Sequence, residues 1–140
     1  MELFLIAHVA SRAVAIPAEQ VESVVDLGEI VPVPGGGRSL RGLAALRSRV
    51  VTVIDTGVAL GLDATPATVR RAVITRVDGH HYAVLVDALE DVAPFIRQPL
   101  AGLRLGAGWA ATGTALIERD GEPLLVIDLP RLVPAMPLAA

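Results

Sequence analysis

The chain has 140 residues, no cysteine and a formal net charge of −3. This length suits one domain of moderate size, and the lack of cysteine excludes disulfides and thiolate metal sites. The 12 basic residues form no cluster and are outnumbered by 15 acidic ones, which argues against nucleic-acid binding. Hydrophobic residues make up 53% and aromatic residues only 3%, so we expect an aliphatic core.

The amino terminus shows no targeting signal. Its apolar stretch follows no basic segment and is too short for a signal peptide with a cleavage site. No apolar run of the chain approaches the roughly 18 residues that a membrane span needs. We therefore expect a cytoplasmic protein without direct membrane insertion.

The first third of the chain is predicted to be mostly extended. Residues 2–9 and 12–16 read as a hairpin with a two-residue link. Residues 17–25 are predicted to form a short helix, because proline suits a first helical turn and two glutamates lie near its positive end. Further extended segments are expected within residues 24–33.

A second hairpin is expected in the middle of the chain. It would join residues 43–47 to residues 50–54 across Ser48-Arg49. The glycine-rich residues 35–39 before it read as a loop. A longer loop is predicted over residues 94–108, which are rich in proline and glycine, and a frayed tail from residue 134.

Two Asp-Gly pairs, at 78–79 and 120–121, mark the firmest predicted hairpins. Such pairs favour type I′ turns, in which both residues have positive φ. The strands expected around them are residues 71–77 and 80–87, and residues 114–119 and 122–128.

Two segments resemble each other. Residues 51–60 (VTVIDTGVAL) and 124–133 (LLVIDLPRLV) each read as a strand, an aspartate and one apolar helical turn. Asp55 and Asp128 are predicted to cap these turns through their side chains. The echo suggests two similar β lobes.

Many short strands with regular turn signals predict an all-β barrel or sandwich. Most strands have apolar residues on both faces. Val84 and Val86 point to one side, and Ala83 and Leu85 point to the other. Either the strands lie between two cores, or an outer face is a docking surface.

No catalytic or metal-binding constellation stands out. His80 and His81 are strand neighbours that point to opposite faces and cannot easily share a metal. The acidic residues 87–91 lack the spacing of a calcium loop, and helix capping explains Asp55 and Asp128. We expect no cofactor and no enzymatic activity, although a catalytic triad assembled by folding is not visible in a sequence.

The central segment resembles the signature of CheW-like domains. Residues 40–62, LRGLAALRSRVVTVIDTGVALGL, place four short motifs at the family's spacing without a gap: Arg41-Gly42, Leu46-Arg47, Val53-Ile54-Asp55 and Leu60-Gly61. Residues 16–34, 82–92 and 113–133 resemble further family motifs in the family's order. The resemblance covers about residues 3–134.

This resemblance implies one domain over residues 1–140, made of two intertwined lobes. The family fold is two packed SH3-like, five-stranded β-barrels with few short helices. CheW-like proteins are non-catalytic adaptors in chemotaxis. They couple the cytoplasmic tips of chemoreceptors to the regulatory domain of a CheA-type histidine kinase, at membrane-associated arrays.

Four residues match family positions implicated in receptor contact or its support: Val21, Gly42, Arg47 and Ala83. A helical receptor tip would lay an apolar stripe in an apolar groove, with Arg47 reaching its carboxylates or carbonyls. Arg47 holding a loop of its own domain is the alternative. Gly42 is expected to serve backbone geometry.

The chain also departs from the family pattern in its most informative region. The departures are Ala45 for an asparagine, Ser48 for a glycine, Thr52 for a proline, and Thr56-Gly57 for Leu-Arg. They favour a second hypothesis, a divergent module that couples a histidine kinase in a pathway other than chemotaxis. A third, an enzyme on a small barrel, would need a pocket of convergent polar groups.

Overall fold

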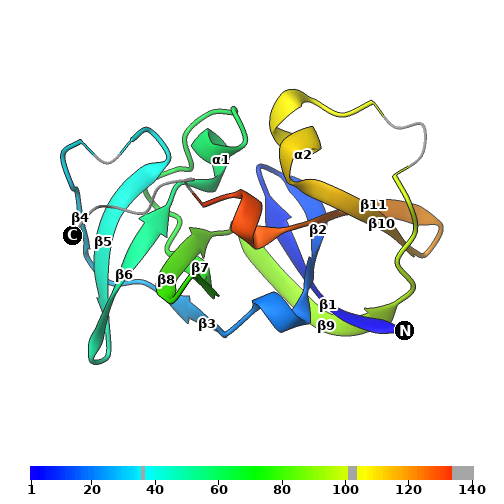
Figure 1. Ribbon diagram of the computed structural model, residues 1–140, viewed down its shortest axis with the longest axis horizontal. Coiled ribbons are helices and arrows are strands. Elements are labelled where there is room, and N and C mark those ends of the chain that lie inside the picture. Colours follow the sequence, from blue (N-terminus) through cyan, green and yellow to red (C-terminus); the bar gives the residue numbers. More distant parts are fainter. Residues whose placement is uncertain (36, 101–103, 134–140) are drawn as a thin grey trace.

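The computed structural model describes residues 1–35, 37–100 and 104–133. They form two β-barrel lobes side by side with few short helices (Figure 1), which confirms the predicted fold class. We call them the terminal barrel, which holds the first and last strands of the chain, and the central barrel. The predicted tail from residue 134 and residue 36 of the glycine loop lie outside the described residues.

The terminal barrel is a sheet of order β10-β11-β2-β1-β9. Its strands are β1 (Glu2–Val9), β2 (Arg12–Pro17), β9 (Ala88–Phe95), β10 (Gly113–Arg119) and β11 (Glu122–Ile127). A bridge between Gln98 and Leu116 links the chain after β9 to β10 and so closes the sheet on itself. Closure removes the free edges that an open sheet would expose.

The central barrel is a sheet of order β3-β7-β8-β6-β5-β4. Its strands are β3 (Ser23–Asp26), β4 (Ile30–Val31), β5 (Leu40–Leu46), β6 (Arg49–Ile54), β7 (Arg71–Val77) and β8 (His80–Leu85). The two-residue β4 adds a sixth strand to the five expected. The helical elements among the described residues are α1 (Thr56–Ala59), α2 (Ala107–Thr112) and the 3-10 turns η1 (Ala18–Gln20) and η2 (Leu129–Arg131).

Both barrels repeat one strand order, which confirms the internal echo. The order β3-β7-β8-β6-β5 of the central barrel corresponds to β9-β1-β2-β11-β10 of the terminal barrel, and each contains one parallel pair. The register agrees as well, since the pair Val53–Ala83 matches the pair Val126–Ala15. Asp55 and Asp128 therefore occupy equivalent positions. The terminal barrel therefore consists of the first two strands of the chain and the last three.

The strands do lie between two cores. Val84 and Val86 pack into a cluster shared by both barrels, together with Trp109 of α2. Ala83 and Leu85 point into the separate core of the central barrel. The two barrels thus share an apolar interior, and removing either barrel would expose it to water.

The predicted hairpins are confirmed, with one correction at the β5–β6 turn. Leu46 pairs with Arg49, so the turn is Arg47-Ser48 rather than Ser48-Arg49. Ala44 and Val51 are paired and buried, and a slip of either strand by one residue would turn that strand's core side chains toward solvent. The core therefore fixes the register, and Arg47 takes a φ of 57° in the left-handed region.

The helix predicted over residues 17–25 is wrong beyond its first turn. Only η1 is helical, and β3 follows from Ser23. Val24 pairs with Val73, and the Glu22 amide donates to the Ile74 carbonyl. Sheet pairing and β-branched side chains override the local helix signals.

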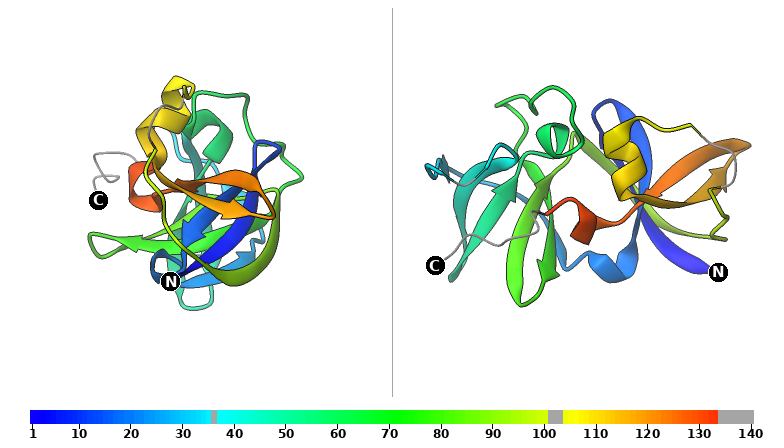
Figure 2. Two further views of the ribbon diagram at one scale, coloured as in Figure 1. Left: turned by 90° about the vertical axis from the view of Figure 1, so that its right-hand side faces the viewer. Right: turned by 45° about the horizontal axis from the view of Figure 1, so that its top comes forward.

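The predicted loop over residues 94–108 also needs correction. β9 continues to Phe95, and α2 begins at Ala107. Trp109 is buried in the shared core, which holds this short helix against the barrels. A β carbon on Gly108 would lie 1.7 Å from the Leu60 carbonyl oxygen, so α2 packs directly on the end of α1 (Figures 1 and 2).

Candidate partner-binding surface

Two of the four predicted contact residues lie inside the central barrel. Gly42 and Ala83 are both paired with Val53, which lies between them in one row across the sheet. Ala83 has an exposed fraction of 0% and Gly42 is buried too. Neither can touch a partner while the barrel is intact, so any effect on binding must act through the fold.

Gly42 is needed for the backbone of its own strand. Its φ is 149°, and a β carbon there would lie 2.2 Å from the Val31 carbonyl oxygen of β4. Any side chain at this position would push β4 away from β5. The geometric role expected from the sequence is therefore visible in the close approach of these two strands.

Val21 and Arg47, in contrast, reach the surface. Val21 follows η1, is half-buried and packs on the shared core. Arg47 is exposed at the tip of the β5–β6 hairpin. Among the described residues, its guanidinium makes no hydrogen bond or ion pair, so the alternative of a loop-holding Arg47 finds no side-chain contact in support.

A groove of about 460 Å³ lies beside Arg47, between β3 and the end of the β5–β6 hairpin. Ile74 forms part of its lining, and Val24, with an exposed fraction of 41%, stands at its rim. Val50, on the outside of the hairpin, is exposed by 63%. The exposure of these valines is not predictable from the sequence, because alternation alone does not show which face of a strand remains uncovered.

A polar cluster fixes the hairpin beside this groove. The carboxylate of Glu22 lies 3.0 Å from His81 Nε2 and 3.8 Å from the Arg49 guanidinium. Arg49 also contacts the His81 ring nitrogen. These contacts join the chain before β3 to the start of β6 and the start of β8, so they hold both sides of the groove in register.

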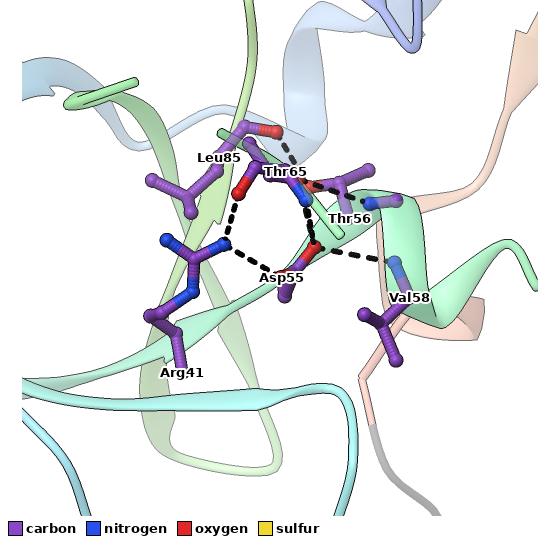
Figure 3. Close-up of polar contacts among 7 residues, drawn as sticks. Arg41, Asp55, Thr56, Val58, Thr65 and Leu85 are labelled. Carbon is purple, nitrogen blue, oxygen red and sulfur yellow. Dashed lines mark hydrogen bonds and ion pairs between the residues drawn. The ribbon is translucent and has the colours of Figure 1, made fainter. Parts of the chain in front are cut away.

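Asp55 is the centre of a network of polar contacts (Figure 3). It follows β6, is only 3% exposed, and accepts a hydrogen bond from the Val58 amide, as its predicted capping role requires. The same carboxylate accepts from the Thr65 amide at 3.0 Å and the Thr65 hydroxyl at 2.7 Å. Arg41 donates to its other oxygen at 2.6 Å.

The Asp55 network ties three segments together. Arg41 comes from β5, and Thr65 from the loop that runs from α1 to β7. Next to it, the buried Thr56 hydroxyl donates to the Leu85 carbonyl of β8. A β carbon on Gly57 would lie 2.1 Å from the Asp63 carbonyl oxygen. The unusual Thr56-Gly57 pair thus serves internal packing.

Burial alone would raise the pKa of Asp55, but the hydrogen bonds from Arg41, Thr65 and Val58 outweigh it and hold the pKa below the usual 3.8. A group whose pKa is lowered in the folded state stabilises the fold at pH values above its unfolded pKa. It loses that effect as the pH falls through the folded pKa.

We expect the stability difference between the wild type and Asp55→Asn to be constant above about pH 5 and to shrink below about pH 4. Urea unfolding of both proteins from pH 7 to pH 3 measures it, and a difference independent of pH would contradict it.

The capping role predicted for Asp128 is wrong. Its side chain makes no hydrogen bond to the first turn of η2. Instead Gln20 donates to Asp128 and accepts from the Leu129 amide at 2.8 Å. Pro130 occupies the second position of the turn and has no amide hydrogen to offer, so a glutamine from η1 takes the place of a cap.

Two general properties of the described residues bear on function. No helix in residues 1–35, 37–100 and 104–133 is long and apolar enough to cross a membrane. Within the same residues, histidine and acidic side chains form no group of three or more with the geometry to hold a metal ion.

Known proteins share both sequence and architecture with this chain. The chemotaxis protein CheW of Thermotoga maritima is 20% identical over 126 residues, which cover 90% of this chain and 83% of that protein. The crystal structure of the scaffolding protein TtCheW from Thermoanaerobacter tengcongensis superposes with a TM-score of 0.77 at 19% identity, over 90% of this chain and 88% of that one. Residues 3–136 match the CheW-like domain. The chain therefore belongs to the family of CheW-like domains.

Proposed function

We propose that this protein is a non-catalytic adaptor that couples chemoreceptor tips to the regulatory domain of a CheA-type histidine kinase. Family membership supports the adaptor class, and the relatives named above are a chemotaxis protein and a scaffolding protein. Its place in the cell would be the cytoplasmic side of a receptor array, reached through its partners.

The groove beside Arg47 is the observation that carries the proposal. It combines apolar lining residues, among them Val24 and Ile74, with the exposed guanidinium of Arg47, which has no partner among the described residues. A helical tip can lay apolar side chains in such a groove while a carboxylate or a carbonyl meets Arg47. The half-buried Val21, next to Glu22 in the chain, extends the apolar surface.

Arg47→Glu is expected to weaken binding of a receptor-tip hairpin at least tenfold without altering the fold. The arginine is exposed, so its loss breaks no contact among the described residues, while a glutamate would repel an acidic partner group. Isothermal titration calorimetry with a synthetic receptor-tip hairpin measures the change. Thermal unfolding of the variant checks that the fold is intact.

Arg38→Glu is the matched control. Arg38 is also exposed but lies before β5, whereas Arg47 lies beyond its other end. This variant carries the same charge change and is expected to bind within twofold of the wild type. Equal affinity of both variants would remove Arg47 from the interface, and unfolding of Arg47→Glu would make the residue structural.

A second candidate function rests on two departures from the family pattern. Ala45 and Ser48 are both exposed and flank Arg47 on the same hairpin. Substitutions at such positions change partner choice at little cost in stability. A divergent module for a non-chemotaxis pathway would bind the kinase regulatory domain but not the receptor hairpin, and the same titrations distinguish the two functions.

A further inference from the structure

A larger groove, of about 750 Å³, is lined by residues of both barrels and by residues next to α1. In the ribbon, α1 and η1 lie on opposite sides of the molecule (Figure 1). The β1–β2 turn and the first residue of β9 form one wall, and the loop from α1 to β7 forms the other. Ala10 and Pro66 are among its apolar lining residues, together with Leu62, which is 43% exposed.

The repeat of strand order relates this groove to a smaller one, of about 450 Å³, beside η1. The β1–β2 hairpin matches the β7–β8 hairpin in register, and His8 of the first is equivalent to Arg76 of the second. His8 lines the larger groove, and Arg76 lines the smaller one. Gly57 and Pro130 are also equivalent, since each lies two residues after its aspartate. Gly57 lines the larger groove, and Pro130 lines the smaller one. The fold therefore builds an inter-barrel groove twice, on opposite faces.

The charge of the two grooves differs. Arg76 lines the smaller groove together with Glu19 and Glu22. The lining of the larger groove includes Asp63 and Asp87, and no arginine is among the described residues that form it. Its His8 contacts Glu90 at 2.7 Å. The larger groove therefore keeps two carboxylates without a cation, and a concave surface focuses their field.

Both walls of the larger groove are held in place. The Asp87 amide donates to the His8 carbonyl, and an Asp87 side-chain oxygen accepts from the Ser11 amide at 3.1 Å. On the other side, Asp55 holds Thr65, and Gly57 packs against the Asp63 backbone. A preformed groove saves a partner the entropy of ordering it.

We propose that this groove docks a basic segment of a partner protein, one that presents arginine or lysine between small apolar side chains. The cation would meet Asp63 and Asp87, and the apolar side chains would cover Ala10 and Leu62. A bare metal ion would leave that apolar surface exposed. The proposal does not rest on the proposed function, because the groove faces away from η1 and stays open when the surface near Val21 is occupied.

The test uses the full chain and a short probe peptide, Ac-Ala-Arg-Ala-Ala-Arg-Ala-NH₂, with a glutamate version as the negative probe. In a titration followed by ¹⁵N–¹H correlation spectra, we expect the arginine peptide to shift the amides of residues 8–11, 62–65 and 87–88. Asp63→Asn should weaken its binding at least threefold. Asp87→Asn should do the same, since asparagine still accepts the Ser11 hydrogen bond.

The matched control removes two charges elsewhere. Asp120→Asn with Glu122→Gln changes the β10–β11 hairpin, whose turn residue Asp120 has a φ of 51° that asparagine tolerates. This double variant should keep the wild-type affinity within twofold. If the control variant weakened peptide binding equally, or if the amide shifts extended over the β10–β11 hairpin, the peptide would be binding through net charge alone. Either result would overturn the proposal.

Because Asp63 is exposed and its side chain makes no hydrogen bond among the described residues, Asp63→Asn alone keeps the test valid even if Asp87→Asn loosens the turn. A loss of receptor-hairpin binding in Arg47→Glu with unchanged peptide binding would confirm that the two surfaces are separate. The reverse result, peptide binding abolished by Arg47→Glu, would contradict the placement of the groove.

Discussion

Asp55→Ala is expected to lower the free energy of unfolding by about 3 to 5 kcal/mol, the range for breaking a buried ion pair by removing one partner. The substitution leaves the Arg41 guanidinium, the Thr65 amide and the Val58 amide without their shared acceptor. Urea unfolding at pH 7, followed by the fluorescence of the single tryptophan, measures it. That residue, Trp109, is buried in the shared core and reports on both barrels.

Asp128→Ala is the matched control, because Asp128 occupies the equivalent position of the terminal barrel. Within the described part of the chain, its carboxylate contacts only Gln20 and, at 3.4 Å, the exposed Arg131. We expect a loss of about 1 kcal/mol or less. Equal losses for both variants would mean that the Asp55 network contributes no more than an ordinary surface pair.

Comparison of these two aspartates shows how far the sequence predicts the local structure. Both aspartates directly follow a strand that ends in Val-Ile, and this pattern predicts a side-chain cap at each. The backbone turn does form twice, since it depends on local residues. The cap forms only at Asp55, because the choice of partner depends on Arg41 and Thr65 in one barrel and on Gln20 in the other.

The hairpins were predictable for a similar reason. Asp78 and Asp120 each precede a glycine and take φ values of 50° and 51°, so local chemistry determines these turns. The structure of the segment after Pro17 was not predictable, because its local helix signals compete with pairing to β7, a strand some fifty residues later in the chain. Long-range pairing leaves no mark in a short window of sequence.

The candidate surface was predicted only in part. Alignment to the family pattern places Gly42 and Ala83 beside Arg47, but it does not distinguish an exposed residue from a buried one. Ala83 is covered because its side chain points into the core of the central barrel, which forms only when β8 pairs with β6 on one side and with β7 on the other. That arrangement follows from the sheet order, which no motif of this sequence specifies.

Gly42→Ala tests the distinction between contact and support. A methyl group 2.2 Å from the Val31 carbonyl oxygen, at a φ of 149°, forces β4 away from β5. We expect the free energy of unfolding to fall by about 3 kcal/mol, from overpacking and backbone strain together. Urea unfolding gives the total, and hydrogen exchange of the β4 amides shows whether Ile30 and Val31 lose protection first.

Gly28→Ala separates this effect from the general cost of replacing glycine. Gly28 lies in the link from β3 to β4, it is exposed, and an added β carbon there would meet nothing within 4 Å. Its stability should stay within about 0.5 kcal/mol of the wild type. If Gly42→Ala were as stable as Gly28→Ala and still failed to bind a receptor hairpin, Gly42 would belong to the contact surface. If it binds less only in proportion to its unfolding, its family position reflects the close approach of two strands.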